Sequence, residues 1–194
     1  MNKISLVIRK ITVPPVFAAT LLIIAYVMHP SYFGSLWHLF GGLLFLCGLP
    51  LLAYPLQRFI PHFKDKGRDG QRSLAMIFSA VGYLIGTLVA FITQAPFQLK
   101  VIYLEYLLCG ISILVINKVF KLKASGHACG IVGPVFMMIH FGMYIPAAVC
   151  TLLIIPVYVS SIRTKRHTPW QLIGGSVIPP AMLCVIYLIY MIFG

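Results

Sequence analysis

Hydrophobic and polar residues alternate along this chain in long blocks. Seven apolar runs, most of them about 20 residues long, are separated by short breaks that contain polar residues, proline or glycine. The runs cover residues 11–28, 35–56, 74–92, 101–120, 128–143, 146–159 and 172–193. Because a helix satisfies its own backbone hydrogen bonds in lipid, the pattern predicts an all-α, polytopic transmembrane bundle with six to seven membrane spans.

The composition favours the same class of protein. Hydrophobic residues make up 60% of the 194 residues and charged residues only 9%, which is more apolar surface than a soluble domain of this size can bury. No internal repeat or low-complexity linker divides the chain, so we expect a single integral-membrane domain over residues 1–194. The N-terminal segment carries no small-residue cleavage site, and we expect its apolar run to be a retained helix.

The charged residues are confined to the breaks. If all seven runs cross the membrane, 14 of the 15 basic residues lie on one face, and Lys100 alone lies on the other. The positive-inside rule then places that face in the cytoplasm. Scattered loop cations of this kind are typical of membrane topology, and they argue against a nucleic-acid partner. The 14 residues are Lys3, Arg9, Lys10, Arg58, Lys64, Lys66, Arg68, Arg72, Lys118, Lys121, Lys123, Arg163, Lys165 and Arg166.

Three breaks on this face, 57–72, 117–127 and 160–171, combine cations with histidines. Arginine and lysine bind phosphoryl oxygens, and the start of a helix adds unpaired N–H groups and a positive dipole end. His127 and His167 each stand at a predicted helix start. One histidine could attack phosphorus while the other protonates a leaving oxygen. The pattern therefore indicates a phosphate site at the mouth of the bundle.

Three segments, in this order, resemble the motifs of the type 2 phosphatidic acid phosphatase superfamily, whose members share a fold with vanadium haloperoxidases. Residues 64–73 (KDKGRDGQRS) resemble its K-x6-R-P motif, residues 124–127 (ASGH) its P-S-G-H motif, and residues 167–171 (HTPWQ) the end of its S-R-x5-H-x3-D motif. The similarity covers residues 57–180. It implies a helical membrane enzyme that hydrolyses a phosphomonoester or diphosphate of a lipid through a phosphohistidine, with neither a metal nor a cofactor.

The resemblance also implies a role for each matched residue. His167 would be the nucleophile, His127 the general acid for the leaving alkoxide, and Gln171 the residue that orients His167. The phosphoryl oxygens would be held by Arg72, by Lys64 or Lys66, by Ser125 and the N–H of Gly126, and by Arg163, Lys165 or Arg166.

Three positions depart from the motifs. Ser73 stands in place of the proline, Ser161 in place of an arginine, and Gln171 in place of the aspartate that orients the nucleophile. Spacing of four residues still puts Gln171 on the same helix face as His167. Its carbonyl oxygen can accept the imidazole N–H but cannot stabilise an imidazolium by charge, so we expect a less basic nucleophile.

Two other classes of function fit parts of the sequence. A haem-binding membrane electron carrier could use histidines such as His38, His127 and His140 as axial ligands. A non-catalytic lipid-binding or transport protein could share the same helices. For a phosphatase, phosphatidic acid, phosphatidylglycerophosphate and prenyl (di)phosphates present the same phosphoryl group, so the sequence leaves the substrate open among them.

Overall fold

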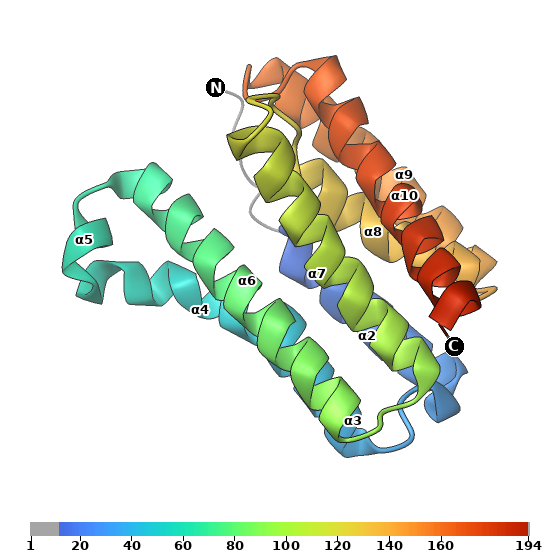
Figure 1. The fold of residues 1–194 in the computed structure, drawn as a ribbon. Helices are drawn as coiled ribbons and strands as arrows, with labels where there is room; N and C mark the ends of the chain where they lie inside the picture. Colours follow the sequence, from blue (N-terminus) through green and yellow to red (C-terminus); the bar gives the residue numbers. More distant parts are fainter. Residues whose placement is uncertain (1–11, 194) are drawn as a thin grey trace.

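The chain is built from helices. The computed structural model describes residues 12–193, and no strand occurs among them. The long and medium helices, shown in Figure 1, are α2 (Pro14–Met28), α3 (Leu36–Gly42), α4 (Leu49–Leu56), α6 (Gly67–Ile92), α7 (Phe97–Lys118), α8 (Gly126–His140), α9 (Tyr144–Arg163) and α10 (Pro169–Phe193). Shorter turns are η1 (Pro30–Tyr32), the π-turn η2 (Leu43–Gly48), η3 (Gln57–Phe59) and α5 (Pro61–Lys64).

The predicted all-α class is confirmed for the described residues, and the lengths of their apolar helices are those of a membrane-spanning bundle. Five helical segments of the described chain are long and apolar enough to cross a membrane, and α2 and α8 are shorter apolar helices of 15 residues each. All seven predicted runs coincide with helical segments, although residue 11, the first of the first run, lies outside the described residues.

Two boundaries that we predicted from polarity are wrong. The break 57–72 is mostly helical, because η3 and α5 follow α4 directly and α6 begins at Gly67, seven residues before the predicted run. Helix α9 likewise extends to Arg163, beyond residue 159. A helix continues into polar residues as long as its backbone hydrogen bonds are satisfied. Polarity therefore marked where these segments leave the apolar region and not where the helices end.

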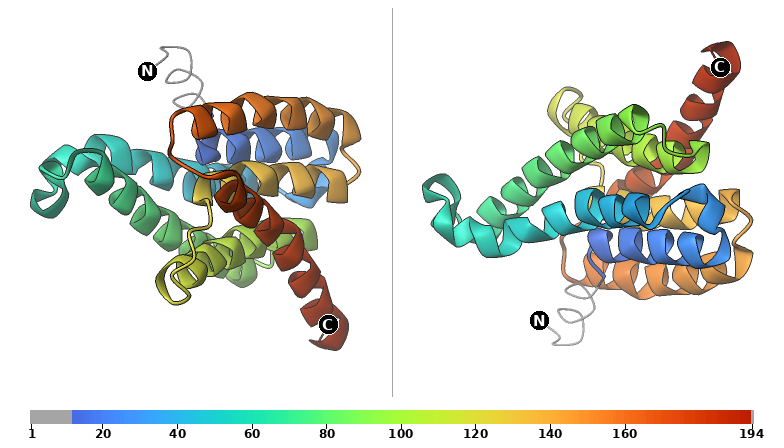
Figure 2. Two further views of the ribbon diagram at one scale, coloured as in Figure 1. Left: turned by 90° about the horizontal axis from the view of Figure 1, so that it is seen from above. Right: turned by 90° about the horizontal axis from the view of Figure 1, so that it is seen from below.

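Helix α8 occupies the centre of the main bundle. It packs against α2, α7, α9 and α10, and Figure 2 shows α2, α8 and α9 lying side by side. Its buried residues include Ile131 and Met137, which are fully covered. A helix that is apolar on all sides is suited to a position enclosed by other helices.

Helices α4 and α6 form an antiparallel pair beside this bundle. A Cβ atom at Gly82 of α6 would collide with the carbonyl oxygen of Phe45 in η2, so glycine lets α6 approach the π-turn that precedes α4. At its C-terminal end α6 also packs against α7. Toward its N-terminal end the pair leans away from α7–α10, and α5 lies at the far tip (Figures 1 and 2).

The segment that contains α3 and α4 is locally irregular. The π-turn η2 separates the two α-helices, and Pro50 follows it in the first turn of α4. Proline lacks an N–H group and its ring crowds the carbonyl four residues earlier. A π-turn is one of the few ways in which a helix accommodates such a break while it continues in the same direction.

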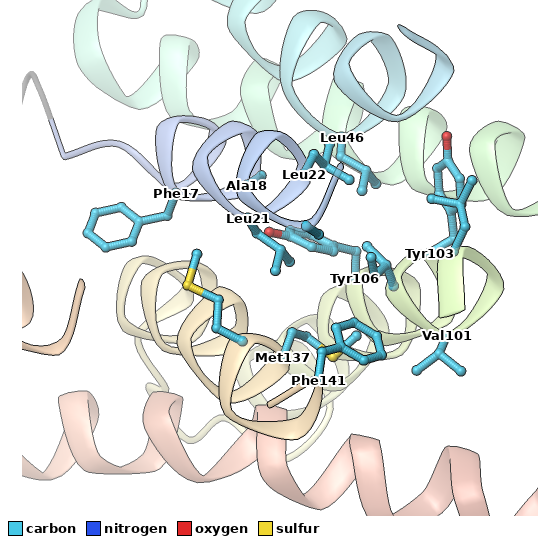
Figure 3. Close-up of a cluster of buried hydrophobic side chains, with 14 of the residues drawn as sticks. Phe17, Ala18, Leu21, Leu22, Leu46, Val101, Tyr103, Tyr106, Met137 and Phe141 are labelled. Carbon is cyan, nitrogen blue, oxygen red and sulfur yellow. The ribbon is translucent and has the colours of Figure 1, made fainter. Parts of the chain in front are cut away.

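Apolar side chains from α2, α7, α8 and η2 form the core. Figure 3 shows Leu21 and Leu22 of α2 beside Tyr106 of α7 and Met137 of α8. Both leucines and Met137 are fully buried. Since lipid is as apolar as these side chains, their contribution to stability comes from close packing more than from removal of water.

One acidic residue is enclosed within a membrane-spanning helix. Glu105 of α7 is 2% exposed. The thiol of Cys109, one turn later, donates to Glu105 Oε1 at 3.6 Å. The other two acids of the chain, Asp65 and Asp69, lie at the α5–α6 tip.

We expect Leu21→Ala to lower the free energy of unfolding by about 2 kcal/mol or more, because it leaves a cavity at a fully buried position. Ile23→Ala is the matched control on the same helix, since Ile23 is 49% exposed. Thermal unfolding of the two detergent-solubilised variants measures the difference. Equal shifts in melting temperature would contradict the packing of α2.

Candidate functional site

The start of α8 is held by two polar side chains. Ser125 is the N-cap residue, and its Oγ accepts a hydrogen bond from the N–H of Ala128 at 3.2 Å. At the end of α7, the side-chain amide of Asn117 binds both backbone groups of Ala124: it accepts from the N–H at 2.7 Å and donates to the carbonyl at 3.1 Å. These bonds fix the chain immediately before Gly126 and His127.

The start of α10 is a capping box. The N–H of Gln171 donates to Thr168 Oγ1, and the N–H of Thr168 donates to Gln171 Oε1, both at 3.3 Å. Pro169 occupies the first helical position, where its missing N–H costs nothing. The residues Thr168-x-x-Gln171 thus have a structural role in addition to any chemical one.

The two helix starts are joined directly. The N–H of Ser125 donates to the carbonyl oxygen of Gln171 at 2.9 Å. Gly175 lies one turn along α10 and faces the same residue, so that a Cβ atom there would collide with the carbonyl oxygen of Ser125. The contact brings the breaks 117–127 and 160–171 together, as the phosphate-site hypothesis requires.

His167 is oriented by Gln171. Its Nδ1 lies 3.2 Å from Gln171 Oε1. An amide oxygen only accepts, so Nδ1 carries the proton and Nε2 carries the lone pair. The contact between Gln171 and the imidazole that the four-residue spacing predicted is therefore present.

A pocket of about 490 Å³ lies beside His167. It is lined by three cationic residues, by His167, by the two capping-box residues and by two apolar residues. The lining residues are Lys123, Ile162, Lys165, Arg166, His167, Thr168, Pro169 and Gln171. No carboxylate belongs to this lining, so the pocket is strongly positive and suits an anion.

The end of α9 presents two of these cations. Lys165 has a φ of +51°, and its N–H donates to Ile162 O while the N–H of Arg166 donates to Ser161 O. This is a Schellman motif, in which the left-handed position is more often glycine. Ser161, which stands where the resembled motif has arginine, is fully buried beneath this turn.

The predicted phosphate-binding residues at the start of α8 are adjacent to the pocket but are not part of its lining. Ser125 is fully buried, and its hydroxyl oxygen is engaged as the N-cap. Gly126 and His127 form the first turn of α8 and are half-buried. Their position relative to the pocket is set by the backbone hydrogen bond from Ser125 to Gln171.

Other predicted residues lie apart from the pocket. Lys64 ends α5, Lys66 precedes α6, and Arg72 lies in the second turn of α6; all three are exposed on the tip that leans away from α8–α10. Arg163, the last residue of α9, is exposed and does not line the pocket either. The structure therefore brings together the second and third resembled motifs but not the first.

The sequence hypothesis did not include three residues that build the site. Lys123 lines the pocket, Asn117 holds the preceding chain, and Thr168 caps α10. A capping-box pattern was readable in Thr168-x-x-Gln171. The role of Asn117 had no comparable signal, because it depends on where the chain turns after α7.

The comparisons with known proteins add no relative. The chain matches no protein-family model, no curated protein matches it significantly, and no solved structure does so either.

We expect Gly175→Ala to destabilise the fold by about 2 kcal/mol, because the added methyl group must push α10 away from the Ser125 carbonyl. Gly174→Ala is the matched control: its Cβ would meet only Ala124 Cβ, at 4.0 Å, and alanine favours a helix. The melting temperatures of the two variants measure the effect. A variant Gly175→Ala as stable as Gly174→Ala would contradict the close approach of the two helix starts.

Proposed function

We propose that this protein is a membrane phosphatase that removes a phosphoryl group from a lipid phosphomonoester or diphosphate through a phosphohistidine on His167. The observation that carries the proposal is the hydrogen bond between His167 Nδ1 and Gln171 Oε1, at 3.2 Å, beside a pocket that Lys123, Lys165 and Arg166 line. A nucleophile that attacks phosphorus needs a free lone pair and positive groups that hold the phosphoryl oxygens. A histidine fixed in one tautomer next to three cations has both.

In the proposed reaction the Nε2 lone pair of His167 attacks phosphorus, and the bond between phosphorus and the lipid oxygen breaks. His127 would protonate that leaving oxygen. Water then attacks the phosphohistidine and gives a proton to His127, so that inorganic phosphate is released and both histidines are restored. The positive charge on the imidazolium is not offset by Gln171, so the nearby phosphate itself has to provide the opposite charge.

The cations of the pocket support the binding of the phosphoryl oxygens. Arg166 can offer two parallel N–H groups, and Lys123 and Lys165 add point charge. In this proposal they replace the predicted contributions of Lys64, Lys66 and Arg72. The lipid tail would leave the pocket toward the surrounding bilayer, because the pocket lies at the end of apolar helices.

The alternative of a haem-binding electron carrier has weaker support. His38 Nδ1 lies 2.7 Å from the carbonyl oxygen of Phe33 and its Nε2 lies 3.1 Å from Thr93 Oγ1. His140 Nε2 lies 2.6 Å from the hydroxyl of Tyr187. His127 and His140 stand at opposite ends of α8, so they do not face each other as an axial pair must. The third class is a non-catalytic lipid-binding or transport protein. Such a protein could bind a lipid phosphate in the same pocket, and it would differ from a phosphatase only because it does not hydrolyse the bound lipid.

We also propose that all seven apolar segments cross the membrane and that the pocket opens to the cytoplasm. The support is the distribution of cations, since the ends of α7 and α9 and the α5–α6 tip carry nearly all those of residues 12–193. Lys3, Arg9 and Lys10, which motivated part of this hypothesis, lie outside the described residues.

We expect His167→Ala to lower phosphate release from lipid phosphates by about 10³-fold or more, because the nucleophile is lost. Release of inorganic phosphate from phosphatidic acid, phosphatidylglycerophosphate and prenyl diphosphate vesicles, with EDTA present, measures the effect. His29→Ala is the matched control, since His29 is also half-buried but stacks on Tyr32 at the other end of the bundle.

Gln171→Glu sharpens the same experiment. Glutamate keeps the capping box and adds the charge that the resembled motif has, so this variant should hydrolyse the substrate at least as fast as the wild type. Unchanged turnover in His167→Ala would exclude the phosphohistidine mechanism. If neither the wild type nor any of the variants releases phosphate, the non-catalytic class is favoured.

Single-cysteine labelling tests the arrangement of the spans. In a chain without the native cysteines, we expect cysteines at Arg68 and Lys165 to share one side and cysteines at Thr93 and Tyr144 to share the other. An impermeant thiol reagent applied to intact cells should label only the second pair if the pocket is cytoplasmic. Labelling of Arg68 and Lys165 alone would reverse the orientation, and labelling of Thr93 without Tyr144 would contradict seven crossings.

A further inference from the structure

The tip formed by η3, α5 and the first turns of α6 stands at an edge of the molecule. It joins two candidate membrane spans, Leu36–Phe59 and Gly67–Ile92, so it lies where both leave the apolar region. Figures 1 and 2 show α5 well separated from α8, α9 and α10. We call residues 57–72 the basic hairpin.

The basic hairpin has a built conformation. The side chain of Gln57 is 9% exposed, and its Nε2 donates to the carbonyl oxygens of Phe63, at 3.0 Å, and Gly67, at 2.6 Å. This single amide ties η3 to α5 and to the start of α6. A hairpin held in this way presents its other side chains in fixed directions.

Those side chains carry an excess of positive charge. The basic hairpin holds a third of the basic residues of the chain and two acids, which gives a net charge of +3 with histidine neutral. All of its cations are exposed: Arg58, Lys64, Lys66, Arg68 and Arg72. They do not line the phosphate pocket beside His167.

Aromatic rings support two of these cations. The guanidinium of Arg58 lies 4.6 Å from the centre of the Phe59 ring, and Lys66 Nζ lies 5.7 Å from the centre of the Phe63 ring. Lys66 also donates to His62 Nε2 at 2.9 Å. These neutral partners position the cations without cancelling their charge. Phe59 itself is 66% exposed at the end of its span, where an aromatic ring suits the lipid interface.

We propose that the basic hairpin is a docking surface for the headgroups of anionic phospholipids in the surrounding leaflet. The charge is complementary, the cations stand at the level of the interface, and the exposed ring of Phe59 lies beside them. Cations placed next to a membrane-spanning helix attract anionic lipid through its phosphate. This surface is separate from the pocket, and the proposal does not depend on any phosphatase activity.

Fluorescence quenching by brominated lipid tests the proposal on the full chain in vesicles. Phe59→Trp places a fluorophore on the hairpin, and Trp37→Phe with Trp170→Phe removes the two native tryptophans. Quenching is compared in vesicles that contain phosphatidylglycerol or phosphatidylcholine, each brominated near the headgroup end of its acyl chains. The ratio of the two relative association constants reports the preference for anionic lipid.

We expect an anionic preference of roughly fivefold or more, the amount that one interfacial cation contributes. In the combined variant Lys64→Gln, Lys66→Gln, Arg68→Gln the ratio should fall toward one. The matched control Lys64→Arg, Lys66→Arg, Arg68→Lys keeps the charge and should keep the preference.

A ratio near one with the unsubstituted hairpin would overturn the proposal whether or not the variants fold. The same holds if the glutamine variant, with an unchanged melting temperature, retains the full preference. In that case the hairpin cations would serve only to orient the spans. Since the readout is lipid contact, failure here leaves the phosphate-release experiment on His167 unaffected.

Discussion

The pocket end of the bundle depends on the hydrogen bond from the N–H of Ser125 to the carbonyl oxygen of Gln171, 2.9 Å long, with Gly175 packed against the same serine. Each helix start is already rigid, because α8 has its own N-cap and α10 its own capping box. The contact therefore joins two preformed pieces. His127 and His167, 40 residues apart in the chain, take their relative position from it.

The side chain of Gln171 makes two contacts at the start of α10. Its Oε1 accepts from the Thr168 N–H and from His167 Nδ1. The first bond caps the start of α10, and the second orients the imidazole of His167. An amide meets both requirements without adding a charge at the start of α10. The cations of the neighbouring pocket are then left for an anion that comes from outside.

The cations on this face fall into two groups with different surroundings. Lys123, Lys165 and Arg166 line a pocket next to a histidine, whereas those of the basic hairpin stand in the open at the edge of the molecule. Lys165 of the pocket group takes the left-handed conformation, which costs a residue with a side chain some free energy. In the basic hairpin the rings of Phe59 and Phe63 contact two of the cations, and Gln57 holds the backbone. None of the hairpin cations takes the left-handed conformation.

The sequence by itself determined the all-α class, the approximate place of the apolar helices and the pairing of His167 with Gln171, because apolar run length and four-residue spacing act locally. It did not determine that residues 57–72 continue as helix, since polar residues leave a membrane without ending a helix. Nor could it place Arg72, whose distance from His167 depends on how far α6 leans from α7. That angle depends on close contacts such as Gly86 of α6 against Tyr103 of α7, which come from the packing of whole helices. Only the tertiary structure therefore separated the pocket from the basic hairpin.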